Sequence, residues 1–130
     1  MKSLDTNVLV RFLIGDDEAQ AQLVHRIFLN AEQQGQLLYI STVVLLETIW
    51  VLDSVYGCSR SAILEAMENL VKMPILCFER RDAVISLCQN TRDIDPADLL
   101  IGLIAKDAGC DTTLTFDRKA AKSGLFTLIE

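Results

Sequence analysis

The sequence DIDPADLLIGLIAKDAGCDTTLTFD, residues 93–117, decides the fold that we expect for this chain. Asp95 stands at a typical helix N-cap position, a proline follows it, and Asp98 lies three residues after the cap. Apolar residues at helical spacing come next, and Gly109 is a typical helix stop. This part of the stretch therefore predicts a capped helix with acidic residues in its first turn.

A second acidic position follows the helix. Residues 112–115 are β-prone and predict a short strand, with Asp117 just past its end. In an open α/β sheet, ligands bind at the carboxyl ends of the strands. The acids can equally be helix caps, because carboxylates accept hydrogen bonds from free N–H groups and complement the helix dipole. The stretch alone leaves both interpretations open.

The rest of the chain alternates between β-prone and helical segments. The first helix has Thr6 or Asn7 as its expected cap, and Ser41 or Thr42 is the expected cap of the third. The pattern predicts strands at 1–4, 37–40, 75–78, 112–115 and 126–129, and helices at 8–14, 16–34, 43–56, 59–72, 81–91 and 95–108. Such alternation predicts a parallel sheet that is covered by helices on both faces.

The predicted helix 43–56 carries apolar residues around nearly its full circumference, which is typical of a buried helix. Glu47 lies in its first half, too far into the helix to be a cap. A buried carboxylate costs several kcal/mol unless it is paired, protonated or bound to a metal ion. We therefore consider two roles for Glu47, a metal ligand or a structural partner of Arg11.

The composition limits the class of protein. With 130 residues, of which 51% are hydrophobic, the chain is expected to form one ordered domain over residues 1–130. We expect a cytoplasmic protein, because the sequence holds neither an apolar run of about 20 residues nor a signal-peptide pattern. The four cysteines lack metal-site spacing and are expected to be buried free thiols.

Charge and histidine content exclude several chemistries. A single histidine, His25, argues against Ser-His-Asp catalysis, against ribonuclease chemistry with two histidines and against a zinc cluster. The net charge of −6 argues against simple electrostatic binding of nucleic acid. If the substrate is a nucleic acid, a cation must mediate between the acidic protein and the phosphates.

Four acids have a shared structural logic: Asp5 follows the first strand, Glu47 lies on the third helix, Asp98 begins a helix, and Asp117 follows the fourth strand. Right-handed crossovers bring the carboxyl ends of parallel strands to one side of the sheet. Clustered carboxylates without histidine or thiolate partners favour Mg²⁺ or Mn²⁺, and such ions act on phosphate esters.

At this point the sequence resembles a known family, the PIN-domain ribonucleases, and within it the small VapC-type toxins of toxin–antitoxin pairs. The motifs that carry the resemblance are residues 5–13 (DTNVLVRFL), 41–42 (ST) before Glu47, 50–52 (WVL), Asp95, 98–101 (DLLI), 109–111 (GCD) and 115–119 (TFDRK). The resemblance implies a PIN-like three-layer α/β/α sandwich around a central, mostly parallel sheet of about five strands.

The resemblance also implies roles for individual residues. The acidic quartet would hold one or two Mg²⁺ or Mn²⁺ ions for hydrolytic cleavage of RNA, and Asp95 matches a less essential acid nearby. The supporting residues and the candidates for holding the RNA backbone are, respectively, Thr6, Asn7 and Thr115, and Arg11, Arg118, Lys119 and Lys122. The implied partners are a cognate antitoxin, whose tail enters the active-site groove, and a second copy of the chain in a homodimer.

Two other functions stay open at the level of the sequence. A phosphate- or nucleotide-binding module of the flavodoxin or receiver type also carries acids at strand ends, but it would need a glycine-rich loop or a receiver-type lysine. A PIN-like scaffold without catalysis would be expected to lack some of the four acids, all of which are present.

Overall fold

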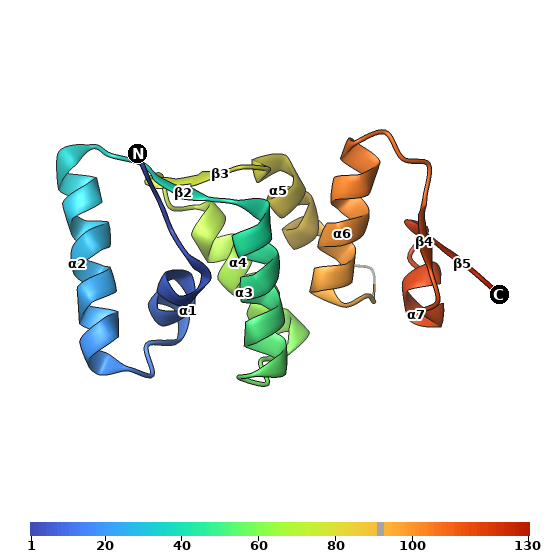
Figure 1. Cartoon of the computed structure of the whole chain (residues 1–130), viewed down its shortest axis with the longest axis horizontal. Coiled ribbons are helices and arrows are strands. Elements are labelled where there is room, and N and C mark those ends of the chain that lie inside the picture. The colour runs from blue at the N-terminus through green and yellow to red at the C-terminus, as the bar shows by residue number, and fades with distance from the viewer. Residues whose placement is uncertain (91–92) are drawn as a thin grey trace.

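The computed structural model describes residues 1–90 and 93–130. Helices and strands alternate along the chain as the sequence predicts, so the α/β class is confirmed. The end of the fifth predicted helix at Thr91 lies outside the described residues. In chain order the elements are β1 (Lys2–Ser3), α1 (Thr6–Ile14), α2 (Glu18–Gln34), β2 (Leu38–Ile40), α3 (Thr42–Ser54), α4 (Arg60–Val71), β3 (Leu76–Phe78), α5 (Arg81–Gln89), α6 (Pro96–Asp107), β4 (Thr113–Thr115), α7 (Arg118–Ala121) and β5 (Phe126–Leu128) (Figure 1).

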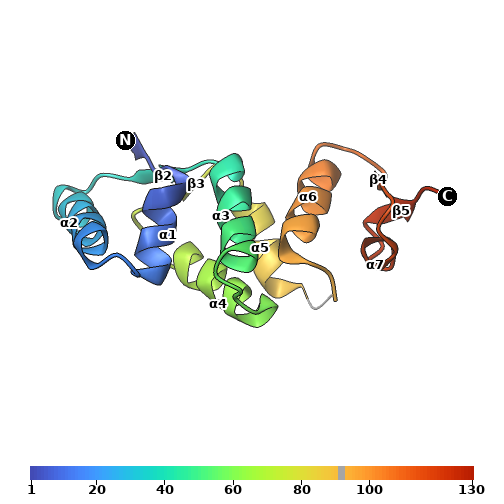
Figure 2. The ribbon, with the colours of Figure 1, turned by 60° about the horizontal axis from the view of Figure 1, so that its bottom comes forward.

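All described strand pairs are parallel, but the strands divide into two sheets. β1, β2 and β3 form one sheet in that order, while β4 pairs with β5 in a second sheet. Figures 1 and 2 both show α6 between the helices around the first sheet and the unit made of β4, α7 and β5. Helices and parallel strands are present as in the expected α/β/α sandwich, but the described strands form two sheets instead of one central sheet of about five strands, with the start of β5 against α6.

The packing of this last unit on α6 depends on Gly102. A Cβ atom at Gly102 would lie 2.8 Å from Cε2 of Phe126 and 3.2 Å from Cβ of Leu125, too close for ordinary contact. Both of these side chains are buried, as are Leu99, Leu100 and Leu103 on α6. The absence of a side chain at residue 102 thus lets the apolar face of β5 settle directly on the helix, which burial of apolar surface favours.

The helix starts are set by local hydrogen bonds. The N–H of Thr6 donates to Oδ1 of Asp5 at 2.8 Å, so Asp5 caps α1 and the expected cap at Thr6 or Asn7 is wrong. The extended backbone of Asp5 lets its side chain reach the first free N–H of the helix. Ser41 caps α3 through its hydroxyl, Asp95 caps α6, and Asp117 caps α7.

Helix α3 is not buried on all sides, which corrects the sequence-based prediction. Leu45, Ile49 and Leu52 are buried, whereas Val43 is 75% exposed and Trp50 58% exposed, and Glu47 between them is exposed as well. Position 43 and the residues four and seven places later lie on one side of a helix. Other elements pack only against the opposite side of α3. The apolar residues around its whole circumference therefore predicted more burial than the structure shows.

Burial elsewhere also differs from what the sequence suggests. On α2 the buried side chains are Val24, Phe28 and Ala31, while the apolar residues Leu23 and Ile27 are exposed. Cys110 is exposed and the other cysteines are half-buried, so the expected burial of all four thiols is wrong. None of the helices in the described part of the chain combines the length and the hydrophobicity needed to span a membrane.

Candidate active site

The first turn of α6 presents two acids in different roles. Oδ1 of Asp95 accepts hydrogen bonds from the N–H of Ala97 at 2.9 Å and from that of Asp98 at 3.4 Å. Asp95 therefore acts as the cap that the sequence predicts, and this cap uses only one of its carboxylate oxygens. Asp98, by contrast, accepts no capping hydrogen bond from the residues that the structure describes, so its carboxylate is available for other partners.

The surroundings of Asp98 disfavour its ionised form. Burial raises the pKa of Asp98, and the negative charges of Asp95 and then Asp117 raise it further, while the positive charge of Arg60 lowers it. Arg60 is itself bound to Asp93 at 2.5 Å on the surface, so it compensates little of this charge. The start of α6 thus concentrates negative charge that a cation would relieve.

Asp117 reaches this region from the other side, between β4 and α7. Its N–H donates to Oγ1 of Thr115 at 3.0 Å, and its Oδ1 accepts from the N–H of Lys119 at 2.8 Å and from that of Ala120 at 3.3 Å. Thr115 therefore fixes the backbone from which Asp117 projects, in line with the supporting role that the resemblance implies. As with Asp95, the cap leaves the second carboxylate oxygen available.

A pocket of about 250 Å³ lies beside Asp95 and Asp98. Its other polar or aromatic lining comes from Trp50, Asp53 and Ser54 at the end of α3. The sequence analysis missed Trp50 and Asp53 as site residues. Trp50 follows Glu47 by three residues and Asp53 follows Trp50 by three, and this spacing is the signal that places all three on adjoining turns of α3.

Glu47 lies one turn before Trp50 on the exposed side of α3. Among the described residues it has no hydrogen-bond or ion-pair partner, so the alternative of a structural pair with Arg11 is wrong. The guanidinium of Arg11 instead contacts other side chains, namely Gln20 at 2.7 Å and Asp16 and Tyr56 at 3.0 Å each. Arg11 thus connects α1 to the start of α2 and to the segment that follows α3. These contacts leave its side chain little freedom to bind RNA.

The remaining candidates lie on α1 and α7. Thr6 is buried and contributes its backbone N–H to Asp5, while Asn7 is exposed at the start of α1. Arg118 and Lys119 are exposed on α7, next to Asp117, where they can contact a phosphate backbone. Neither Asp5 nor Glu47 is among the charges that shift the pKa of Asp98.

The chemistry of the acids at the start of α6 fits a hard divalent cation. Asp95, Asp98 and Asp117 offer carboxylate oxygens, and their mutual repulsion is the kind that such an ion relieves. Within residues 1–90 and 93–130, however, no three side chains of the His, Cys, Asp or Glu type are close enough together to hold one metal ion. The three acids are close enough for their charges to interact, but they are not close enough to coordinate one ion together.

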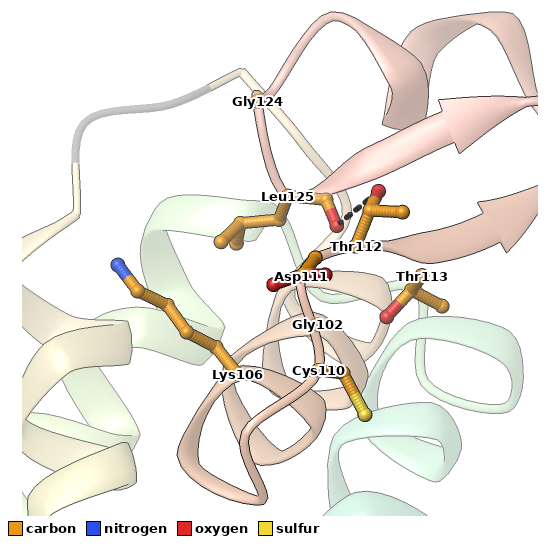
Figure 3. Close-up of a pocket in the computed structure, with 8 residues that line it drawn as sticks. All are labelled: Gly102, Lys106, Cys110, Asp111, Thr112, Thr113, Gly124 and Leu125. Atoms are coloured by element: carbon orange, nitrogen blue, oxygen red, sulfur yellow. Dashed lines mark hydrogen bonds between the residues drawn. The ribbon is translucent and has the colours of Figure 1, made fainter.

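A second cavity, of about 160 Å³, lies at the opposite end of α6 (Figure 3). Its lining includes Lys106 from the end of the helix, and Cys110 and Asp111 from the segment between the helix and β4. The hydroxyl of Thr112 points to the carbonyl oxygen of Leu125 at 3.5 Å and closes one side. The cavity holds none of the predicted acids, so it is separate from the candidate active site.

Comparison with known proteins gives two matches that cover this region. A family model described as the PIN domain matches residues 2–124, which include all the predicted site residues. A curated relative, the VapC ribonuclease of Aquifex aeolicus (strain VF5), is 27% identical over 130 residues, which cover 98% of this chain and 96% of that protein. No solved structure is significantly similar to the chain.

Proposed function

Since the chain belongs to the PIN domain family, we propose that it is an endoribonuclease of the VapC type that depends on Mg²⁺ or Mn²⁺. The observation that carries the proposal is the group of acids at the start of α6, where burial first, and then the negative charges of Asp95 and Asp117, raise the pKa of Asp98. The name of the relative from Aquifex aeolicus supports RNA as the substrate.

Asp98, Asp117, Asp5 and Glu47 would hold the cation, and Asp95 would assist. When bound, a divalent cation supplies an activated water molecule and stabilises charge on the phosphate. The chain itself fixes Asp117 through Thr115 and through the N–H groups of α7, and it fixes Asp5 through the N–H of Thr6. Arg118 and Lys119 would hold the RNA backbone beside Asp117.

The direct test is cleavage of a mixed RNA pool by the purified protein. We expect cleavage with Mg²⁺ or Mn²⁺, and none after the metal is removed with EDTA, because the acids alone repel the phosphates. Adding back the metal should restore cleavage, which excludes damage by the chelator. Cleavage that persists in EDTA would refute the metal-dependent mechanism, and an inert protein with metal would favour a binding scaffold.

We also propose that a small antitoxin and a second copy of the chain bind this protein. An acidic groove attracts cationic side chains, and an arginine of the antitoxin would pair with carboxylates there. Exposed Leu23 and Ile27 on α2 supply apolar surface for contact between two copies. Light scattering should give the mass of a dimer for the free protein and a larger mass after coexpression with the neighbouring gene product. A monomer in both samples would contradict both proposals.

A further inference from the structure

Trp50 is the largest side chain in the pocket beside the acids, and it is 58% exposed. An indole ring that faces solvent loses the stabilisation that burial of its apolar surface would give it. The buried side of α3 is formed by Leu45, Ile49 and Leu52, so Trp50 is not needed for the hydrophobic core. Its place in the lining of the pocket leaves the ring accessible to a ligand that binds there.

The pocket has the room and the polar groups to hold a flat, neutral ring. Its volume of about 250 Å³ is several times the roughly 30 Å³ that one water molecule takes up in the liquid. Ser54 and Asp53 lie next to the ring on the following turn, where a hydroxyl and a carboxylate can bond to the edge of a base. A carboxylate accepts from an exocyclic amino group, as aspartate does from N4 of cytosine.

The charges decide which part of an RNA enters this pocket. Asp53, Asp95 and Asp98 repel phosphates. A phosphate can therefore bind beside these carboxylates only together with a cation. A base carries no net charge, and its face can stack on an aromatic side chain. Glu47 precedes Trp50 by three residues on the exposed side of α3, so the acid and the ring are neighbours on the helix.

We propose that Trp50 stacks on an unpaired base of the RNA next to the cleaved phosphate. The inference rests on the proposed function and names a residue that determines its specificity. Asp53 and Ser54 contact the edge of the same base. A duplex cannot present a base in this way, because its bases are stacked on one another.

Trp50 is the single tryptophan of the chain, so its fluorescence reports on the pocket directly. The binding experiment uses the Asp5→Asn variant with Mg²⁺, because asparagine keeps the helix cap and removes a charge that cleavage needs. A short single-stranded RNA should quench the fluorescence, whereas the same RNA with abasic sites should bind without quenching. Equal quenching by the abasic RNA would refute stacking.

Variants of the same protein test the energy of the contact by anisotropy of labelled RNA. Trp50→Ala should weaken binding about ten-fold, because stacking on an aromatic side chain contributes roughly 1–3 kcal/mol per base. Trp50→Phe should keep most of the affinity. Leu29→Ala is the matched control, because Leu29 is 52% exposed on α2 and does not line the pocket, and it should bind as well as the parent protein.

The outcomes separate this inference from the proposed function. Quenching by RNA in a protein that cleaves nothing would refute the nuclease and keep the stacking contact. Cleavage of the mixed pool at the same sites by wild type and Trp50→Ala, with no loss of affinity, would refute the contact alone. Quenching by an arginine-rich peptide but not by RNA would assign the pocket to a cationic side chain of a protein partner.

Discussion

Replacing Asp98 by asparagine should reduce RNA cleavage by about 100-fold or more while leaving the protein at least as stable as wild type. The loss of activity is expected because a neutral amide is a poor ligand for a hard cation, and even groups that only support metal ligands change activity by roughly 10–100-fold. The stability follows from the pKa of Asp98, which burial and the neighbouring acids raise.

The raised pKa of Asp98 makes the stability of the metal-free protein depend on pH. A carboxyl whose pKa is raised by folding stabilises the protein fully below its ordinary pKa, 3.8 for aspartate, and this contribution is lost as the pH rises through the raised value. Without metal, the melting temperature of wild type should therefore fall relative to that of Asp98→Asn across this window.

Asp82→Asn is the matched control, because Asp82 is an exposed aspartate in the first turn of α5 and belongs to no candidate site. It should cleave RNA at the wild-type rate. Melting curves in EDTA over a range of pH, together with cleavage rates in Mg²⁺, give both readouts. An Asp98→Asn protein that melts well below wild type at neutral pH would show that the carboxylate stabilises the fold, and full activity would exclude it from the site.

The second large effect is expected for Glu47→Gln, which should abolish cleavage without changing the fold. The side chain is exposed and has no partner among the described residues, so its replacement should alter the free energy of unfolding by no more than about 0.5 kcal/mol. If Glu47 is a metal ligand, cleavage should fall by about 100-fold, and Mn²⁺ should raise the melting temperature of wild type more than that of the variant.

Glu65→Gln provides the comparison, because Glu65 is an exposed glutamate on α4 that is equally without a partner in the described part of the chain. It removes the same charge from a helix surface and should respond to Mn²⁺ as wild type does. If Glu47→Gln and Glu65→Gln cleave RNA equally well, Glu47 has no part in the reaction. A large loss of stability in EDTA would instead make Glu47 a structural residue.

The sequence predicted the helix caps and the order of elements with good success. Asp95 and Asp117 cap their helices as their positions suggest, because a cap depends only on hydrogen bonds to residues two or three places later. Asp5 was expected only as a site residue, and it caps α1 as well. Capping and metal binding use different oxygens of one carboxylate, so the two interpretations of these acids are compatible.

The sequence was less informative about which faces are covered. The spacing of apolar residues on α2 and α3 defines helices, but it did not show that Ile27 and Trp50 would be exposed. Burial depends on which element packs against a given side, and that element is distant in the sequence. The pocket of Trp50, Asp53 and Asp98 is a product of this packing, because it combines the end of α3 with the start of α6.

The sequence by itself determined the α/β alternation, the parallel strands, the caps of α3, α6 and α7, and the presence of Asp95 and Asp98 together at the start of α6, all of which follow from contacts within a few residues or from connection lengths. Only the tertiary structure decided that β4 and β5 form a sheet of their own on α6 and that Asp117 approaches Asp98. The physical reason is that strand pairing and helix packing join residues far apart in the chain, and local spacing carries no information about which of these partners will bury the most surface.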